Sequence, residues 1–367
     1  MDTALLTSDD FWADETTALA GEPALAGHVL FETSGSSGSP KQVAISKQAL
    51  LVSAATVNNH LAVNRDSNWG LALPLTHVGG FGVAARAWQA GCAFSQFSSR
   101  WKAVAFHDWV AREEITHTSL VPTQVHDLVT AELAAPPSLT AIVVGGGHLD
   151  QQIGRAARRL GWPLLASYGM TEAASQIATQ GLNALDQPYQ SAPIPLLPIW
   201  QAKVSEDGLL CISGQALFSG HLEDGNYFPR RSEWHHTADR ALLAGDFITP
   251  LGRADTMVKI LGELVDPEAI ERELITISGG LLTAGSFAIV AVPDARAENA
   301  LFPILDPSVD PELFEKTLAD YNLKSPGFRK LPAAIQTALL PRTALGKIRR
   351  TELAEFLRYS FKLSSQP

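Results

Sequence analysis

The sequence predicts an α/β fold with a large N-terminal domain of β-sheets flanked by helices and a small α+β domain behind it. Short apolar runs alternate with segments of helical spacing through the first half of the chain, which is typical of sheets with largely parallel strands. After Arg253 the pattern changes to short strands and helices that end in a charged tail. We therefore expect two domains, residues 1–253 and 254–367, which suits a chain of 367 residues.

Periodicity and turn residues locate the individual elements. Strands are expected at Val29–Glu32, Trp69–Pro74, Thr116–Leu120 and Ala141–Val144, and helices at Lys47–Leu61 and Gly82–Gln89. The proline-rich stretch 188–200 can be neither a helix nor a central strand. Residues 204–213 are expected to form a hairpin that turns at Asp207-Gly208.

Composition argues against several classes of protein. A formal net charge of −10 disfavours nucleic acid as the main partner, because phosphate binding needs a basic face. No apolar run reaches the roughly 18 residues of a membrane span, and the N-terminus lacks the basic segment of a signal peptide. Cys92 and Cys211 are too few for a disulfide framework, so we expect a cytoplasmic protein. The adjacent His235 and His236 lack the spacing of a zinc site.

A Ser/Gly-rich loop carries the strongest chemical signal. It has the sequence TSGSSGSPK, begins at Thr33, ends at Lys41 and follows the first predicted strand. Glycines let backbone N–H groups approach a ligand, hydroxyls add donors and the lysine adds charge, which together suit a polyphosphate. The loop is not a Walker A motif. A flexible linker is the alternative, although linkers rarely stand between a buried strand and a helix.

This loop resembles the phosphate-binding loop of the adenylate-forming superfamily, which comprises acyl- and aryl-CoA ligases, peptide-synthetase adenylation domains and luciferases. Further motifs of that superfamily have counterparts in the expected order: Tyr168-Gly169-Met170-Thr171-Glu172, Thr237-Ala238-Asp239, Gly252-Arg253-Ala254-Asp255 and Pro341-Arg342-Thr343-Ala344-Leu345-Gly346-Lys347. The resemblance extends over residues 29–355. It implies that the protein joins a carboxylic acid to AMP, releases pyrophosphate and passes the acyl group to coenzyme A.

The resemblance also implies roles for individual residues toward the nucleotide. ATP- or AMP-binding is implied for Thr33, Ser34, Gly35, Ser36, Ser37, Gly38, Lys41, Gly146, Gly147, Tyr168, Gly169, Met170, Thr171, Asp239 and Arg253. Glu172 would hold Mg²⁺ through a carboxylate oxygen, and a solvated surface acid is the alternative. Asp239 would accept hydrogen bonds from the ribose, and Asp246 is the competing acid for that role.

Lys347 is the expected catalytic lysine of adenylation, because an ammonium stabilises the charge that builds as the carboxylate attacks the α-phosphate. Thr171 would assist by a hydrogen bond to the same phosphate. The alternatives are that Lys347 is a basic tail residue and that Lys41 supplies the catalytic charge.

In the superfamily the C-terminal domain rotates between the two half-reactions. The resemblance therefore implies a mobile C-terminal domain with its hinge at Asp255, and a coenzyme A tunnel that includes Lys259 and Gly262. Leu261 stands where many relatives have glycine or arginine, and Ala238 stands in place of a glycine. Both departures put fine contacts in doubt rather than the chemistry.

Acid selectivity is expected to depend on five positions: His77, Arg86, Gly145, Ser175 and Gln176. The run Gly169–Thr179, together with Arg86 nine residues after His77, is similar to o-succinylbenzoate–CoA ligases of menaquinone biosynthesis. Their substrate has two carboxylates, and Arg86 would bind the one that is not activated. An exposed helix arginine is the alternative for this position.

The expected function is thus an AMP-forming acid–CoA ligase that uses ATP, Mg²⁺ and coenzyme A with a small carboxylic acid, and o-succinylbenzoate is the first candidate. Another aryl- or acyl-CoA ligase, an adenylation enzyme that loads a carrier protein, and a noncatalytic nucleotide-binding relic are the alternatives. A homodimer is left open. The phosphate loop begins closer to the N-terminus than in typical members of the superfamily.

Overall fold

The computed structural model describes residues 8–14, 22–33, 41–294, 296–343 and 346–364. Its contacts divide the chain into two compact units, each of which is treated by itself. The first unit comprises Met1–Thr237 and Ala241–Leu251, and the second comprises Ala238–Arg240 and Gly252–Pro367. Arg253, the last residue of the predicted first domain, therefore belongs to the second unit.

A six-stranded sheet forms the centre of the first unit. Its strands are β3 (Asn68–Leu71), β4 (Ala93–Gln96), β5 (His117–Leu120), β6 (Ala141–Val144), β7 (Leu164–Met170) and β8 (Ser175–Thr179), in the order β4-β3-β5-β6-β7-β8. All neighbours pair in parallel except β7 and β8. β5 and β6 are buried along their whole length, as expected of parallel strands covered on both faces. The predicted parallel α/β architecture is confirmed.

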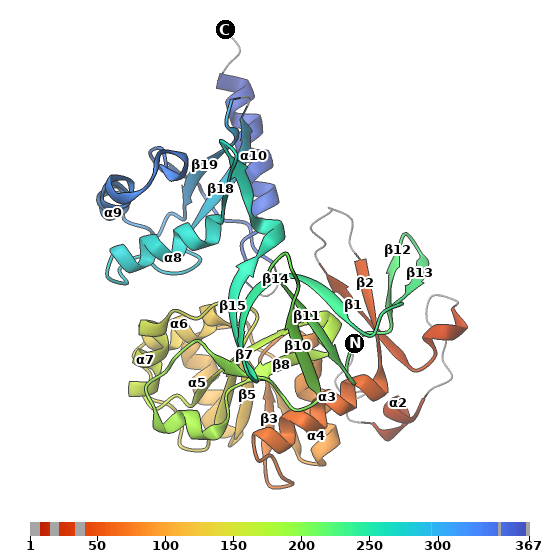
Figure 1. Cartoon of the computed structure of the whole chain (residues 1–367). Coiled ribbons are helices and arrows are strands. Elements are labelled where there is room, and N and C mark those ends of the chain that lie inside the picture. Colours follow the sequence, from red (N-terminus) through yellow and green to blue (C-terminus); the bar gives the residue numbers. More distant parts are fainter. Residues whose placement is uncertain (1–7, 15–21, 34–40, 295, 344–345, 365–367) are drawn as a thin grey trace. The chain divides into compact units, whose positions relative to one another are not determined.

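Helices cover both faces of this sheet (Figure 1). They are α3 (Lys47–His60), α4 (Val78–Ala90), α5 (Ala103–Arg112), α6 (Pro122–Thr130) and α7 (Gln151–Arg159). α3 begins at an N-cap serine, Ser46, whose hydroxyl accepts a hydrogen bond from Ala49 N over 3.1 Å. α4 packs on α3, β3 and β5 and is almost entirely apolar. Both predicted helices and all four predicted strands are present. The strand Ala141–Val144 has the predicted ends, and the other elements differ from the prediction at one or both ends.

Two antiparallel sheets complete the first unit. One has the order β1-β2-β12-β13 and consists of β1 (His28–Thr33), β2 (Lys41–Ser46), β12 (Gly220–Glu223) and β13 (Asn226–Pro229). The other has the order β10-β11-β14-β15-β9 and consists of β9 (Ile194–Pro195), β10 (Trp200–Val204), β11 (Leu209–Gly214), β14 (His235–Ala244) and β15 (Phe247–Arg253), of which the last two reach into the second unit. β10 and β11 form the predicted hairpin. The prolines of the proline-rich stretch are accommodated in β9, at the sheet edge, and in the segments beside it, before β10 begins at Trp200.

Shorter elements connect these layers. They are helix α2 (Asp9–Ala13) and the 3₁₀ turns η1 (Pro23–Leu25), η2 (Thr171–Ala173), η3 (Leu182–Asp186), η4 (Ala254–Thr256) and η5 (Gly327–Arg329). Among the described residues, no helix combines the length and the apolar character that a membrane crossing requires.

The second unit is an α+β domain. Its hairpin consists of β16 (Val258–Ile260) and β17 (Glu263–Val265), and its sheet has the order β18-β19-β20, with β18 (Phe287–Asp294), β19 (Glu298–Leu305) and β20 (Ile335–Gln336). The helices are α8 (Pro267–Ile277), α9 (Pro311–Lys324) and α10 (Arg350–Ser364).

Alternating side chains of β18 supply two separate cores in this unit. Phe287 and Ile289 join a cluster with residues of α8 and α9. Ala288 and Val290 face the other way, into a cluster with Leu353 of α10. This is the period of two expected of a strand, and it anchors the start of α10 to the sheet that also carries α8.

Candidate active site

The carboxyl ends of the parallel strands gather most of the predicted residues of the first unit. His77 follows β3, Gly145 follows β6, and Thr171 follows β7. β3, β5, β6 and β7 are consecutive neighbours in the sheet, so these residues lie along one edge. Open α/β sheets bind ligands at this edge, and the structure therefore brings the predicted residues to a suitable place.

His77 is the N-cap residue of α4. Its carbonyl accepts a hydrogen bond from Phe81 N over 2.9 Å, and its own N–H donates to Pro74 O over 3.2 Å. The backbone N–H and carbonyl of His77 are thus both hydrogen-bonded. The imidazole lies at the N-terminus of α4, the helix that also carries Arg86.

Gly145, Gly146 and Gly147 form the turn after β6. Gly146 has a φ of 75°, a conformation that favours glycine. Gly145 N donates to Leu120 O over 3.2 Å, which ties this turn to the end of β5. The absence of side chains leaves the backbone accessible at the same sheet edge.

The segment Tyr168–Glu172 turns sharply from β7 into β8. The register of these two strands shifts between Tyr168 and Gly169. A Cβ at Gly169 would stand 1.6 Å from Ser175 O, so only glycine fits. Ser175 itself has a φ of 104°, a strained value for a residue with a side chain. Glu172 lies in the turn and is half-buried, so it is neither a fully exposed surface acid nor a core acid.

The Ser/Gly loop connects two strands rather than a strand and a helix. Thr33 at the end of β1 pairs with Lys41 at the start of β2. Ser34, Gly35, Ser36, Ser37 and Gly38 lie outside the described residues. The expectation that a helix follows the loop directly was wrong, because β2 intervenes before α3. Lys41 Nζ lies 3.3 Å from Glu223 Oε2 on β12.

Arg86 is buried inside the first unit, with 1 % of its surface exposed. Its Nη1 donates to Ser119 Oγ over 3.3 Å and its Nη2 to Ser175 Oγ over 3.4 Å. The guanidinium carbon lies 5.2 Å from the centre of the Trp69 ring, within the range of a cation–π contact. The alternative of an exposed helix arginine was wrong.

The charge of Arg86 is not balanced by a carboxylate among the residues that the structure describes. Burial lowers the pKa of Arg86 to about 10. Within the same described set, no group accepts a hydrogen bond from Arg86 Nε or donates one to the amide oxygen of Gln176. Gln176 is also buried and follows Ser175 on β8. The buried guanidinium of Arg86 and the buried amide of Gln176 thus each retain unused hydrogen-bonding capacity.

In the second unit, acidic and basic side chains of the predicted motifs come together. Arg253 Nη1 lies 3.5 Å from Asp239 Oδ1, and its Nε donates to Asp255 Oδ1 over 2.7 Å. The predicted ribose acid, the arginine that assists it and the predicted hinge acid therefore form one charged group. Asp246, the competing acid, is exposed, and its carbonyl accepts a hydrogen bond from Leu196 N over 2.7 Å.

Lys347 lies on the outgoing strand of a tight hairpin, next to the bridge between Arg342 and Ile348. Thr343 N donates to Lys347 O over 2.8 Å, and Arg349 N donates to Pro341 O over 2.8 Å. The protein around the ammonium lowers the pKa of Lys347 by desolvation; Glu268 and Asp239 oppose this effect and Arg253 adds to it. The lysine therefore senses the charged group that contains the predicted ribose acid.

Lys259 and Gly262 belong to the β16–β17 hairpin. Lys259 is exposed, and its carbonyl accepts a hydrogen bond from Asn299 Nδ2 over 2.9 Å. Leu261 and Gly262, with φ values of 52° and 84°, turn the hairpin. Leucine is unusual at such a position, and its side chain is 57 % exposed.

Several residues of these groups escaped the sequence analysis. Ser119 and Trp69 contact Arg86, and Glu268 acts on Lys347, but none belongs to a recognisable motif. β5 is buried at every position and reads HTSL, so no alternation marks Ser119. Its contact with Arg86 depends on the packing of segments that are distant in the sequence.

Comparison with known proteins agrees with this geometry. The model of the family described as AMP-binding enzyme matches residues 26–222. A 2-succinylbenzoate–CoA ligase of Haemophilus influenzae is 30% identical over 249 residues, which are 66% of this chain and 52% of that protein. The chain thus matches about half the length of this relative.

Two further similarities extend over most of the chain. A 2-succinylbenzoate–CoA ligase of Bacillus subtilis is 26% identical over 339 residues, 89% of this chain and 68% of that protein. Among solved structures, E. coli MenE with bound OSB-AMS is 25% identical, with a TM-score of 0.73, over 89% of this chain and 68% of that one. The two-domain fold of the adenylate-forming enzymes is therefore the fold of this chain.

Proposed function

This chain belongs to the AMP-binding enzyme family, and from that premise we propose that it is an ATP-dependent acid–CoA ligase acting on o-succinylbenzoate. In the first half-reaction a carboxylate oxygen of the acid attacks the α-phosphorus of ATP and pyrophosphate leaves. In the second, the thiol of coenzyme A attacks the acyl carbon, loses its proton and displaces AMP.

The observation that carries the choice of acid is the uncompensated charge of Arg86. A buried cation without a counter-ion is costly, and a ligand carboxylate that pairs with it removes that cost. Ser175 links this guanidinium to the turn that begins at Thr171. A dicarboxylic acid would have one carboxylate at Arg86 and the other available for activation, whereas a fatty acid would leave the guanidinium unpaired.

The donor set of the first unit suits a magnesium nucleotide. Glu172 supplies a half-buried carboxylate at the sheet edge, and carboxylate oxygens are the ligands that Mg²⁺ prefers. The metal would neutralise the phosphates of ATP. Thr171 would donate to the α-phosphate, Tyr168 would lie against adenine, and Gly146 and Gly147 would admit the nucleotide to the backbone.

The second unit is proposed to supply the remaining groups. Asp239, with Arg253, would bind the ribose, and Lys347 would stabilise the charge of the adenylation transition state. Asp255 would be the hinge residue, and Lys259 and Gly262 would contact coenzyme A. We propose residues 1–253 and 254–367 as the two functional domains. This division by sequence leaves Asp239 and Arg253 in the first domain, whereas their contacts group them with the second unit.

A comparison of two enzymes with two acids tests the substrate assignment. Pyrophosphate release is measured for o-succinylbenzoate and for the analogue in which hydrogen replaces the carboxylate that is not activated, with and without coenzyme A. A charge-assisted hydrogen bond contributes about 1.5–3 kcal/mol, which corresponds to about a 10- to 100-fold preference for the dicarboxylate. Arg86→Ala should remove this preference.

The rates of the two enzymes with the two acids also distinguish the alternative functions. If Arg86→Ala slows both acids by the same factor, the arginine is structural and another aryl or acyl acid becomes the better candidate. If pyrophosphate is released from ATP but coenzyme A does not accept the acyl group, a carrier protein replaces coenzyme A as the acceptor. The absence of pyrophosphate release with every acid would refute the ligase assignment.

A further inference from the structure

A mostly buried ion pair joins α8 to the start of α10 in the second unit. Arg350 binds Glu271 through both ends of its guanidinium, with Nη1 2.6 Å from Oε1 and Nη2 2.9 Å from Oε2. The two side chains are 27% and 14% exposed. This bidentate geometry fixes both the distance and the orientation of the two groups, which a lysine could not do.

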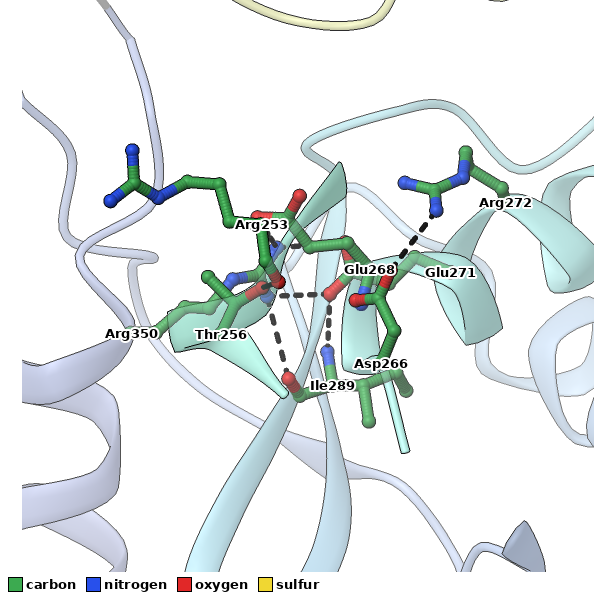
Figure 2. A network of polar contacts seen from close by, with 8 residues as sticks. All are labelled: Arg253, Thr256, Asp266, Glu268, Glu271, Arg272, Ile289 and Arg350. Atoms are coloured by element: carbon green, nitrogen blue, oxygen red, sulfur yellow. Dashed lines mark hydrogen bonds and ion pairs between the residues drawn. The ribbon is translucent and has the colours of Figure 1, made fainter. Parts of the chain in front are cut away.

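The pair also includes the backbone of β18. Ile289 N donates to Glu271 Oε1 over 2.6 Å, and Arg350 Nη1 lies 3.4 Å from Ile289 O. Glu268, one turn before Glu271, lies 3.4 Å from Arg350 Nη2. Figure 2 shows the guanidinium of Arg350 between these groups. Three elements that are far apart in sequence, α8, β18 and α10, are thereby locked together at one point.

The stability of α10 does not account for this arginine. Arg350 is the first residue of α10, and a cation at a helix N-terminus costs about 0.3–1 kcal/mol against the helix dipole. Burial disfavours its charge as well, but Glu271 and Glu268 outweigh that effect and raise the pKa of Arg350. Burial raises the pKa of Glu271, and Arg350 opposes that rise. Since both carboxylate oxygens accept short hydrogen bonds, the pair is ionised.

Lys347 lies three residues before Arg350, on a hairpin that leads directly into α10. On its incoming strand, Arg342 Nη2 donates to Gly285 O over 2.5 Å. On its outgoing strand, Ile348 forms a bridge with Arg342 and packs against the apolar cluster of α10. Arg342 and Ile348 therefore anchor the two hairpin strands beside Lys347, and Arg350 follows Lys347 three residues later.

We propose that Glu271 and Arg350 are a positioning pair, which holds the hairpin strands 341–343 and 346–349 in the orientation that delivers the Lys347 ammonium for adenylation. Neither residue touches the reacting atoms in this role. The inference rests on the proposed function of Lys347, and it predicts that the pair matters for adenylation alone, because coenzyme A thioester formation does not use this lysine.

Glu271→Gln tests the proposal, since it keeps the shape of the side chain and removes its charge. We expect kcat for pyrophosphate release to fall about 10- to 100-fold, the scale of a displacement of about 1 Å in a catalytic group. KM for ATP and the conversion of preformed acyl-AMP to the thioester should stay within about twofold of the wild type. Glu273→Gln is the matched control, because Glu273 lies on the same helix, α8, but pairs with Arg329 of η5 rather than with α10, and this variant should leave both rates unchanged.

A double variant separates positioning from stability. Glu271→Met combined with Arg350→Met replaces the ion pair by apolar groups of similar volume, an exchange that buried ion pairs often tolerate in folding. Thermal unfolding monitors whether each variant is folded. The folded double variant should still be slow in adenylation, because it lacks the ion pair that orients the hairpin. Recovery of wild-type adenylation in it, or an equal loss of both half-reactions in Glu271→Gln, would overturn the proposal.

Failure of the proposed function has a different signature. In that case the wild-type enzyme itself forms no acyl-AMP from ATP and any acid, and both proposals fall together. If only the positioning role is wrong, wild-type adenylation is present, Lys347→Ala abolishes it and Glu271→Gln does not change it.

Discussion

Replacement of Arg86 by methionine should make the unliganded protein more stable and the enzyme less selective. Methionine has a similar length and adapts to irregular cavities, so Arg86→Met removes the charge with little loss of packing. Burial lowers the pKa of Arg86 to about 10. Since arginine ordinarily titrates at about 12.5 or above, and a tenfold change in an equilibrium is about 1.4 kcal/mol, the buried charge costs on the order of 3 kcal/mol.

Part of this gain is offset by contacts that methionine cannot make. The hydrogen bonds to Ser119 and Ser175 are long, 3.3 and 3.4 Å, and together with the cation–π contact to Trp69 they contribute about 1–2 kcal/mol. We therefore expect a net stabilisation of about 1–2 kcal/mol, or roughly 2–8 °C in Tm for a domain of this size. Differential scanning fluorimetry without ligand measures it.

The pH dependence has a definite sign. A base whose pKa is lowered by folding destabilises the folded state at every pH below that lowered pKa, and the cost is relieved only as the pH rises through it. The advantage of Arg86→Met should accordingly stay constant between about pH 6 and pH 9 and shrink above about pH 10.

Ligand should reverse the order of stability. Saturating o-succinylbenzoate should raise Tm of the wild type and leave Arg86→Met nearly unchanged, because binding stabilises only the protein that binds. Arg112→Met is the control, since Arg112 forms an exposed pair with Glu113. A lower Tm of Arg86→Met than of the wild type without ligand would refute the reasoning, because it would mean that the guanidinium already stabilises the fold.

Four further predictions concern three other site residues. Lys347→Ala should nearly abolish pyrophosphate release and spare the conversion of preformed acyl-AMP to the thioester, and equal loss in both steps would contradict its assignment. Because the pKa of Lys347 is lowered, wild-type adenylation should decline as the pH rises, at a pH below that of ordinary lysine titration; an alkaline limb that persists in Lys347→Arg would belong to another group. Glu172→Gln should raise the Mg²⁺ concentration for half-maximal adenylation far more than KM for the acid, and an unchanged metal requirement would exclude it as the ligand. Gly169→Ala should destabilise the first unit by about 1–3 kcal/mol in urea unfolding, because its Cβ would stand 1.6 Å from Ser175 O; a variant of wild-type stability would mean that the β7–β8 turn adjusts freely.

The parallel sheet could be predicted from the sequence because short strand-like runs alternate with segments of helical spacing along the first half of the chain. Ala141–Val144 is followed by three glycines and is buried at every position. The helices α3 and α4 could be predicted equally well, because the apolar spacing that indicates them is a local feature of the sequence. The positions of His77, Gly145 and Thr171 along one edge then follow from the rule that parallel strands present their carboxyl ends together.

Strand β2 was missed because its signal is weak and interrupted. Its six residues begin with two polar side chains, and Ser46 at its end is also the cap of α3. β2 is a strand because β1 and the distant β12 pair with it on either side. Such long-range pairing leaves no local pattern, and for the same reason the partner of Arg350 on α8 could not be found.

The burial of Arg86 could likewise not be predicted from the sequence. Arginine on a helix is ordinarily solvated, and nothing in its neighbourhood marks position 86 as internal except the apolar character of α4. What the sequence did indicate was a chemical need, a second carboxylate. Only the packing of α4 against β3, β5 and β8 turns that expectation into a specific, desolvated guanidinium.

The contact between Arg86 and Trp69 has a practical consequence. The indole N–H of Trp69 donates to Asn58 Oδ1 over 3.2 Å, so the ring keeps a fixed orientation toward the guanidinium. The emission of an indole responds to the electric field across its ring, and an anion that neutralises Arg86 would change that field. The chain contains eight tryptophans, but subtraction of the Trp69→Phe spectrum isolates this one. Intrinsic fluorescence can therefore report the arrival of an acidic ligand at Arg86 before any bond is made.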